Sequence, residues 1–214
     1  MNEFLNKPPA TEKHYNIQRQ KQPVVIAMEL LDRTKVEAGE LYQKGYKLLA
    51  LPVDKYLRLF PELEKSYSKS DQEHIGPAGY HASDQSLNFA LGVATLNKAK
   101  KADKSLNDAC NKAISDAYIR IGFAALDATV GELLMIDAVG TQAIENTGWH
   151  LQFGKDYLEK AARYWGANKA EIYKMLQAKT KEWEQRIGSK DMIVGEFKKR
   201  EVQKGFDDLL EKYK

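Results

Sequence analysis

Apolar residues recur at helical spacing along most of this 214-residue chain, and they are densest near its middle. The segment 121–140 reads IGFAALDATVGELLMIDAVG, and projected on a helix it is apolar nearly all round. A helix that is apolar on every side is enclosed by other helices. The pattern therefore predicts a long central helix from about 105 to 146, with further helices packed around it.

The flanking segments continue this pattern. Pro23 opens a predicted helix that runs to about 49, because proline lacks only an N–H group that the first turn leaves unbonded. Glycine and proline make 68–84 a predicted loop, and no alternating apolar run indicates a sheet. The fold class is therefore all-α, a helical bundle of about six or seven helices. The remaining helices are expected within 51–67, over 84–104, over 149–165, over 168–187 with Asn168 as the N-cap, and over 191–214.

The stretch ENTGWHLQF at 145–153 is predicted to be the corner that ends the central helix. Glycine enters the left-handed conformation at low cost, so Gly148 is the expected C-cap. Trp149 and Phe153 then begin the returning helix, and with Tyr157 they recur every four residues. Such an aromatic stripe is typical of a core face, and alternatively of the wall of a ligand cavity. His150 lies one residue off this stripe.

Three regions follow from these patterns. Residues 1–22 are predicted to be a flexible polar N-terminal arm, 23–188 a helical bundle domain, and 189–214 a charged amphipathic C-terminal helix. The last helix carries a broken apolar stripe among many lysines and glutamates. That stripe is suited to docking on the bundle, to pairing with a partner helix or to self-association.

Charge and cysteine content narrow the function classes. The chain has 33 basic and 30 acidic residues, and this near balance argues against a dedicated nucleic-acid binder. A single cysteine, Cys110, forbids an intramolecular disulfide and fits a reducing compartment. No signal peptide and no membrane-spanning apolar run is recognisable. A cytoplasmic location is expected, and an exported form with its signal removed stays open.

Motifs of known chemistry are missing from the sequence. It contains no Glu-x-x-His or His-Glu-x-x-His metal pattern, no phosphate-binding glycine loop and no nucleophile elbow. Cys110 is expected to be a small buried apolar residue, and a polar stripe of Asp116, Arg120, Asp127 and Glu145 to face water. We therefore predict no catalytic residue, no metal site and no cofactor, and the enzyme question stays open with a leaning towards no.

Five residues are nevertheless candidates for a ligand site. Glu132 falls among apolar residues, where a carboxylate is costly unless it is paired, and where its pKa would rise. A neighbouring lysine or arginine that neutralises Glu132 is the alternative. The candidate set is Glu132, Asp137, Trp149, His150 and Phe153.

Two functional hypotheses result. The first is a non-enzymatic structural or interaction protein, a helical scaffold that engages a protein partner or a second copy of itself through the N-terminal arm and the C-terminal helix. The alternative is a helical ligand-binding protein or an unrecognised enzyme, with a cavity near Glu132 and the Gly148 corner.

Overall fold

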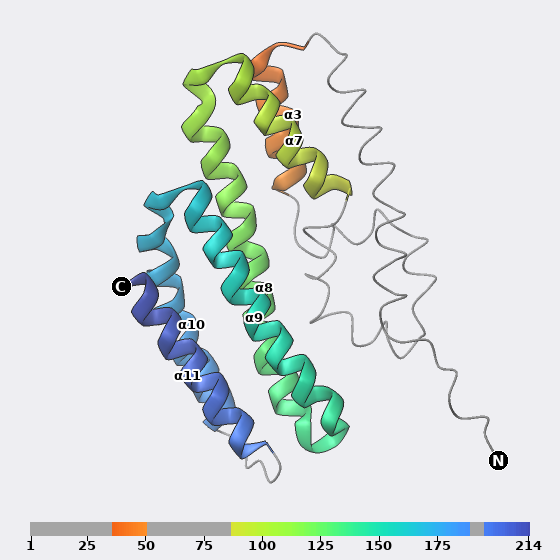
Figure 1. The fold of residues 1–214 in the computed structure, drawn as a ribbon, viewed down its shortest axis with the longest axis vertical. Helices are drawn as coiled ribbons and strands as arrows, with labels where there is room; N and C mark the ends of the chain where they lie inside the picture. Colours follow the sequence, from red (N-terminus) through yellow and green to blue (C-terminus); the bar gives the residue numbers. More distant parts are fainter. Residues whose placement is uncertain (1–35, 51–86, 189–194) are drawn as a thin grey trace, which may run out of the picture.

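The structure, a computed structural model, describes residues 36–50, 87–188 and 195–214. Within these ranges it contains six α-helices, two short 3-10 helices and no strand, which confirms the predicted all-α fold (Figure 1). The predicted N-terminal arm, the first part of the helix predicted from 23, the helices predicted within 51–67 and the loop at 68–84 lie outside the described residues. The α-helices are α3 (Ala38–Leu49), α7 (Leu87–Ala102), α8 (Asn107–Val139), α9 (Thr141–Tyr164), α10 (Lys169–Gly188) and α11 (Glu196–Tyr213).

The centre of the molecule is an antiparallel hairpin of two long helices, α8 and α9 (Figure 1). The predicted central helix is found, but it ends at Val139 and not near 146. Gly140 breaks it with φ 79° and ψ −142°, a backbone conformation that favours glycine, and its N–H donates to the Ile136 carbonyl at 2.8 Å. The predicted corner at Gly148 is therefore wrong, since Gly148 lies well inside α9.

Close contact between α8 and α9 depends on two glycines that face each other. A Cβ added to Gly154 would lie 2.7 Å from Leu126 Cγ, and one added to Gly122 would lie 3.0 Å from Leu158 Cγ. Both distances are too short for ordinary packing, so glycine at these positions permits the observed approach of the two helices. The hairpin is thereby held as a tightly packed unit.

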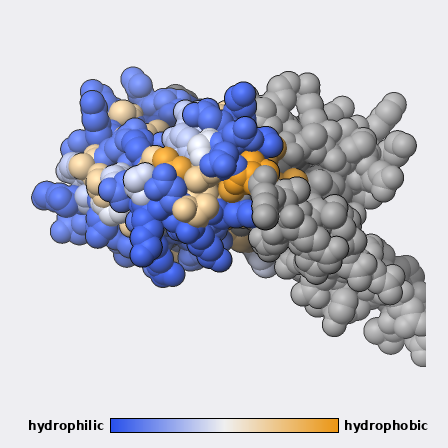
Figure 2. Space-filling view, turned by 90° about the horizontal axis from the view of Figure 1, so that it is seen from above, coloured by the Kyte–Doolittle hydropathy of each residue, from blue (hydrophilic) through white to orange (hydrophobic). Residues whose placement is uncertain are grey.

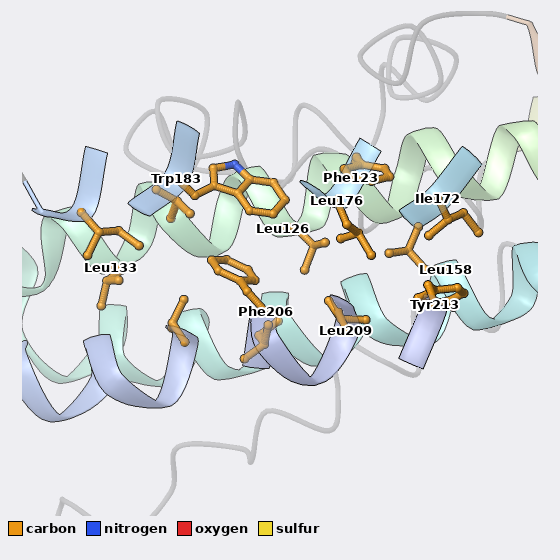
Figure 3. Packing of buried hydrophobic residues seen from close by; sticks show 14 of the residues in the cluster. Phe123, Leu126, Leu133, Leu158, Ile172, Leu176, Trp183, Phe206, Leu209 and Tyr213 are labelled. Atoms are coloured by element: carbon orange, nitrogen blue, oxygen red, sulfur yellow. The ribbon is translucent and has the colours of Figure 1, made fainter. Parts of the chain in front are cut away.

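Two hydrophobic cores lie along the hairpin. One joins α8 and α9 to α3 and α7, with Leu41, Leu96 and Ile121 fully buried. The other joins the hairpin to α10 and α11 and is centred on Trp183 and Phe206, whose rings stack with centroids 4.6 Å apart (Figure 3). Helix α8 contributes side chains to both cores. Cys110 is fully buried in the first core, as expected from the sequence.

The C-terminal helix α11 docks on the bundle, which is one of its three predicted alternatives. Its apolar side chains belong to the second core, and Val202 and Phe206 are completely buried there. The side chain of Phe197, at the start of the helix, is by contrast 80% exposed. No helix within the described ranges combines the length and apolar character that crossing a membrane requires.

The predicted polar stripe of α8 mostly serves neighbouring helices. Trp183 Nε1 donates to Asp127 Oδ1 at 2.7 Å, and Arg120 donates to the Leu49 carbonyl at the end of α3. Asp116 pairs with Lys112 at 2.7 Å. Glu145, the fourth member of the predicted stripe, lies on α9.

Asn168 was predicted as the N-cap of the helix that follows it. Helix α10 begins at Lys169, directly after it. The side-chain amide of Asn168 donates to Asp116 Oδ1 at 2.9 Å and to Ser115 Oγ at 2.8 Å. The residue thus ties the start of α10 to α8.

Candidate functional site

A buried carboxylate and a buried imidazole meet between α8 and α9. Glu132 is 6% exposed and His150 is 3% exposed, and His150 Nε2 lies 3.9 Å from Glu132 Oε1. The hairpin turn at Gly140 places these two residues opposite each other, because the chain reverses midway between them. Glu132 is buried, and its histidine neighbour comes from the adjacent helix.

A cavity of about 250 Å³ opens beside this pair. Gln142, Glu145, Asn146, Trp149 and His150 line it. All five belong to α9, at the three- and four-residue spacing that puts side chains on one helix face. Gln142 Nε2 donates to Asn146 Oδ1 at 3.1 Å, which orders the amide side of the cavity. We call the surface formed by these five residues the Trp149 face.

Trp149 is the most unusual member of the face, because its indole is 60% exposed. It begins a ladder of rings along α9, with Trp149 and Phe153 centroids 6.2 Å apart and Phe153 and Tyr157 centroids also 6.2 Å apart. The prediction that this aromatic stripe packs in the core is correct for Tyr157, which is 3% exposed, and wrong for Trp149.

The carboxylate in the lining of the cavity is that of Glu145. The segment 121–154 contains four acidic residues, Asp127, Glu132, Asp137 and Glu145, and no lysine or arginine. Lys198 of α11 approaches Gly148, where its Nζ would lie 3.2 Å from an added Cβ, but this ammonium is bound to Glu201 at 2.9 Å. Elsewhere, in the view of Figure 2, the surface of the described residues is mostly hydrophilic.

The structure therefore brings four of the five predicted site residues into one region. Trp149 and His150 line the cavity, Glu132 touches His150, and Phe153 packs against Trp149. Asp137 is exposed and does not line the cavity.

Sequence reasoning did not assign Gln142, Glu145 and Asn146 to the site. With the corner placed at Gly148, these residues belonged to the wrong helix. Placing the turn at Gly140 assigns them to the same helix as Trp149.

The described residues hold no group of three or more histidine, cysteine or carboxylate side chains placed to bind a metal ion. What the face offers chemically is an aromatic surface, carboxylate and amide oxygens, and a buried histidine. No protein-family model, curated protein or solved structure matches this chain, so its function has to be argued from this face itself.

Proposed function

We propose that this protein works by binding a partner protein, and that the Trp149 face is the surface that binds it. The single observation behind the proposal is the half-uncovered indole of Trp149 beside a cavity. Tryptophan is enriched among the residues that dominate binding energy at protein interfaces, and such residues sit at or next to pockets. An apolar ring kept in water on an otherwise polar helix face gains most when a partner covers it.

The size of the cavity supports a protein partner over a small molecule. Sites for drug-sized ligands are usually about 300–1,000 Å³ and enclose most of the ligand. The cavity beside Trp149 is smaller, at about 250 Å³, and its lining comes from one face of one helix. This volume suits a single side chain presented by a partner.

The rigidity of α9 supports the same proposal. The helix is fixed against α8 by the close approach at Gly154, and the adjacent His150 is anchored in the interior. A binding surface that is already ordered loses little conformational entropy when the partner arrives. Trp149 therefore projects from a preorganised support.

The sequence hypothesis placed the contact in the N-terminal arm and the C-terminal helix. The arm lies outside the described residues and stays a prediction. The apolar stripe of α11 packs in the second core, and Phe197 is the exposed aromatic residue of this helix. Deletion of 189–214 would remove Phe206 from that core, so single exposed aromatic residues make the cleaner test.

The test is native mass spectrometry of the full chain isolated at its natural expression level. A complex with a second protein, or with a second copy of the chain, is expected for the wild type and lost in Trp149→Ala. Tyr46→Ala removes a comparably exposed ring, 47% exposed, from α3, and is expected to leave the complex intact. A mass equal to the chain alone, or a complex that survives Trp149→Ala, would overturn the proposal.

The alternative hypothesis, a ligand-binding protein or enzyme, is favoured by one observation. His150 lines the cavity and lies 3.9 Å from the buried Glu132, and an acid and an imidazole this close are groups capable of proton transfer. The same measurement separates the two functions. A small mass retained by the wild type and lost in Glu132→Gln would favour the alternative.

A further inference from the structure

We propose that the cavity of the Trp149 face receives a cationic side chain, the guanidinium of an arginine in a basic segment of the partner. This inference rests on the proposed function, and it names the chemistry of the partner. Three features support it: the groups that line the cavity, the charge of Glu145 and a cation that the same helix already binds.

The lining groups match a guanidinium. The indole of Trp149 offers an aromatic face, which attracts a cation through the negative charge above the ring. The carboxylate of Glu145, on the same helix face, accepts charge-assisted hydrogen bonds, and the amide oxygens of Gln142 and Asn146 are further acceptors. A planar guanidinium can stack on the ring and donate at its edge in one position, which a compact ammonium cannot do.

The segment around the cavity reinforces this choice. Glu145 lines the cavity, and the segment 121–154 around it contains no lysine or arginine. This carboxylate therefore attracts basic groups and repels acidic ones. An anionic partner such as a nucleic acid would meet like charge at Glu145. The complementary occupant is therefore a basic protein segment.

The other end of the aromatic ladder shows the same chemistry within the chain. The ammonium of Lys160 lies 4.9 Å from the ring centroid of Tyr157 and 5.7 Å from that of Tyr118. Among the described residues no lysine or arginine is recorded over Trp149, two turns earlier on α9. The partner's guanidinium would lie over the ring of Trp149 as the Lys160 ammonium lies over the ring of Tyr157.

The experiment uses the full chain labelled with ¹⁵N at the indoles of its three tryptophans. The Trp149 signal is assigned by its loss in Trp149→Phe. The probe is the heptapeptide acetyl-Gly-Ser-Ala-Arg-Ala-Ser-Gly-amide, and the control probe carries glutamine in place of arginine. The arginine peptide is expected to move the Trp149 signal saturably, with an affinity that falls as salt is added, whereas the glutamine peptide leaves it in place.

Two variants locate the contact. Glu145→Gln is expected to weaken the arginine peptide by up to about fivefold, the range of an exposed ion pair. Glu184→Gln, a matched change of an exposed glutamate on α10, is expected to leave the affinity unchanged.

An equal response to the two peptides, an equal affinity in both variants, or no response of Trp149 would overturn the inference. The proposed function would survive each of these results if the complex seen by native mass spectrometry still depended on Trp149. In that case the partner would insert a group other than a cation.

Discussion

Replacing Tyr213 by phenylalanine is expected to stabilise the protein, which is unusual for a buried residue. The Tyr213 side chain belongs to the second core and is 5% exposed, and its hydroxyl has no hydrogen-bond partner among the described residues. A buried hydroxyl without a partner loses its bonds to water on folding, at a cost of about 1–3 kcal/mol. Tyr213→Phe keeps the ring and removes this cost, so the free energy of unfolding at pH 8 should rise by about 1 kcal/mol.

The same variant also tests how the free energy of unfolding depends on pH. Burial, with the Glu159 carboxylate as a smaller cause, raises the pKa of Tyr213 from 10.0 to about 12. Above pH 10 the unfolded state releases the phenolic proton while the folded state keeps it, so stability falls as the pH rises towards 12. One pKa unit corresponds to 1.36 kcal/mol, so the wild type should lose about 1 kcal/mol by pH 11 and about 2 kcal/mol by pH 12 on this account.

The assay is urea unfolding followed by far-ultraviolet circular dichroism between pH 8 and 11. The quantity of interest is the difference between wild type and Tyr213→Phe at each pH, because lysines and other tyrosines contribute to both curves. Tyr46→Phe, which removes an exposed hydroxyl, serves as the control. A variant that is less stable than the wild type at pH 8, or two curves that run parallel up to pH 11, would show that the hydroxyl is solvated or bonded in solution.

Three further predictions test the packing of the hairpin and its neighbours by chemical unfolding or thiol labelling. Gly154→Ala should lower the free energy of unfolding by about 1–3 kcal/mol through overpacking, whereas Gly131→Ala, with nothing within 4 Å of the added Cβ, should raise it by about 0.5–1 kcal/mol. Asp127→Ala should cost about 1–3 kcal/mol because it leaves the Trp183 N–H without its acceptor, and Asp127→Asn should cost less because it keeps one; equal losses would contradict this role. Burial raises the pKa of the Cys110 thiol, so iodoacetamide should label the native protein far more slowly than the urea-unfolded chain.

The all-α fold could be predicted because helical periodicity is a local property of the sequence. The densest apolar segment does form the central helix. The position of the turn could not. Gly140 and Gly148 are both glycines within a helical pattern, and a turn that uses one residue leaves no polar loop to mark it. Only packing against the rest of the bundle decides which glycine leaves the helix.

The candidate site could likewise be predicted only in part. The sequence singled out Glu132 because a carboxylate stands out in an apolar segment, and His150 because histidines are few. Their contact at 3.9 Å depends on the register of two antiparallel helices, which one displaced turn changes completely. The exposure of Trp149 likewise depends on which side chains of other elements cover that face of α9. A periodic pattern along one helix does not contain that information.

The sharing of α8 between two cores has a consequence for how the molecule opens. Ile121 is packed towards α3 and α7, while Leu133 is packed among the side chains of the core with α10 and α11. Release of either pair alone leaves the hairpin covered on its other side. Backbone amides in the middle of α8 and α9 should therefore exchange with deuterium more slowly than those of α3, α7, α10 and α11, because they become accessible only when both pairs of covering helices separate from the hairpin.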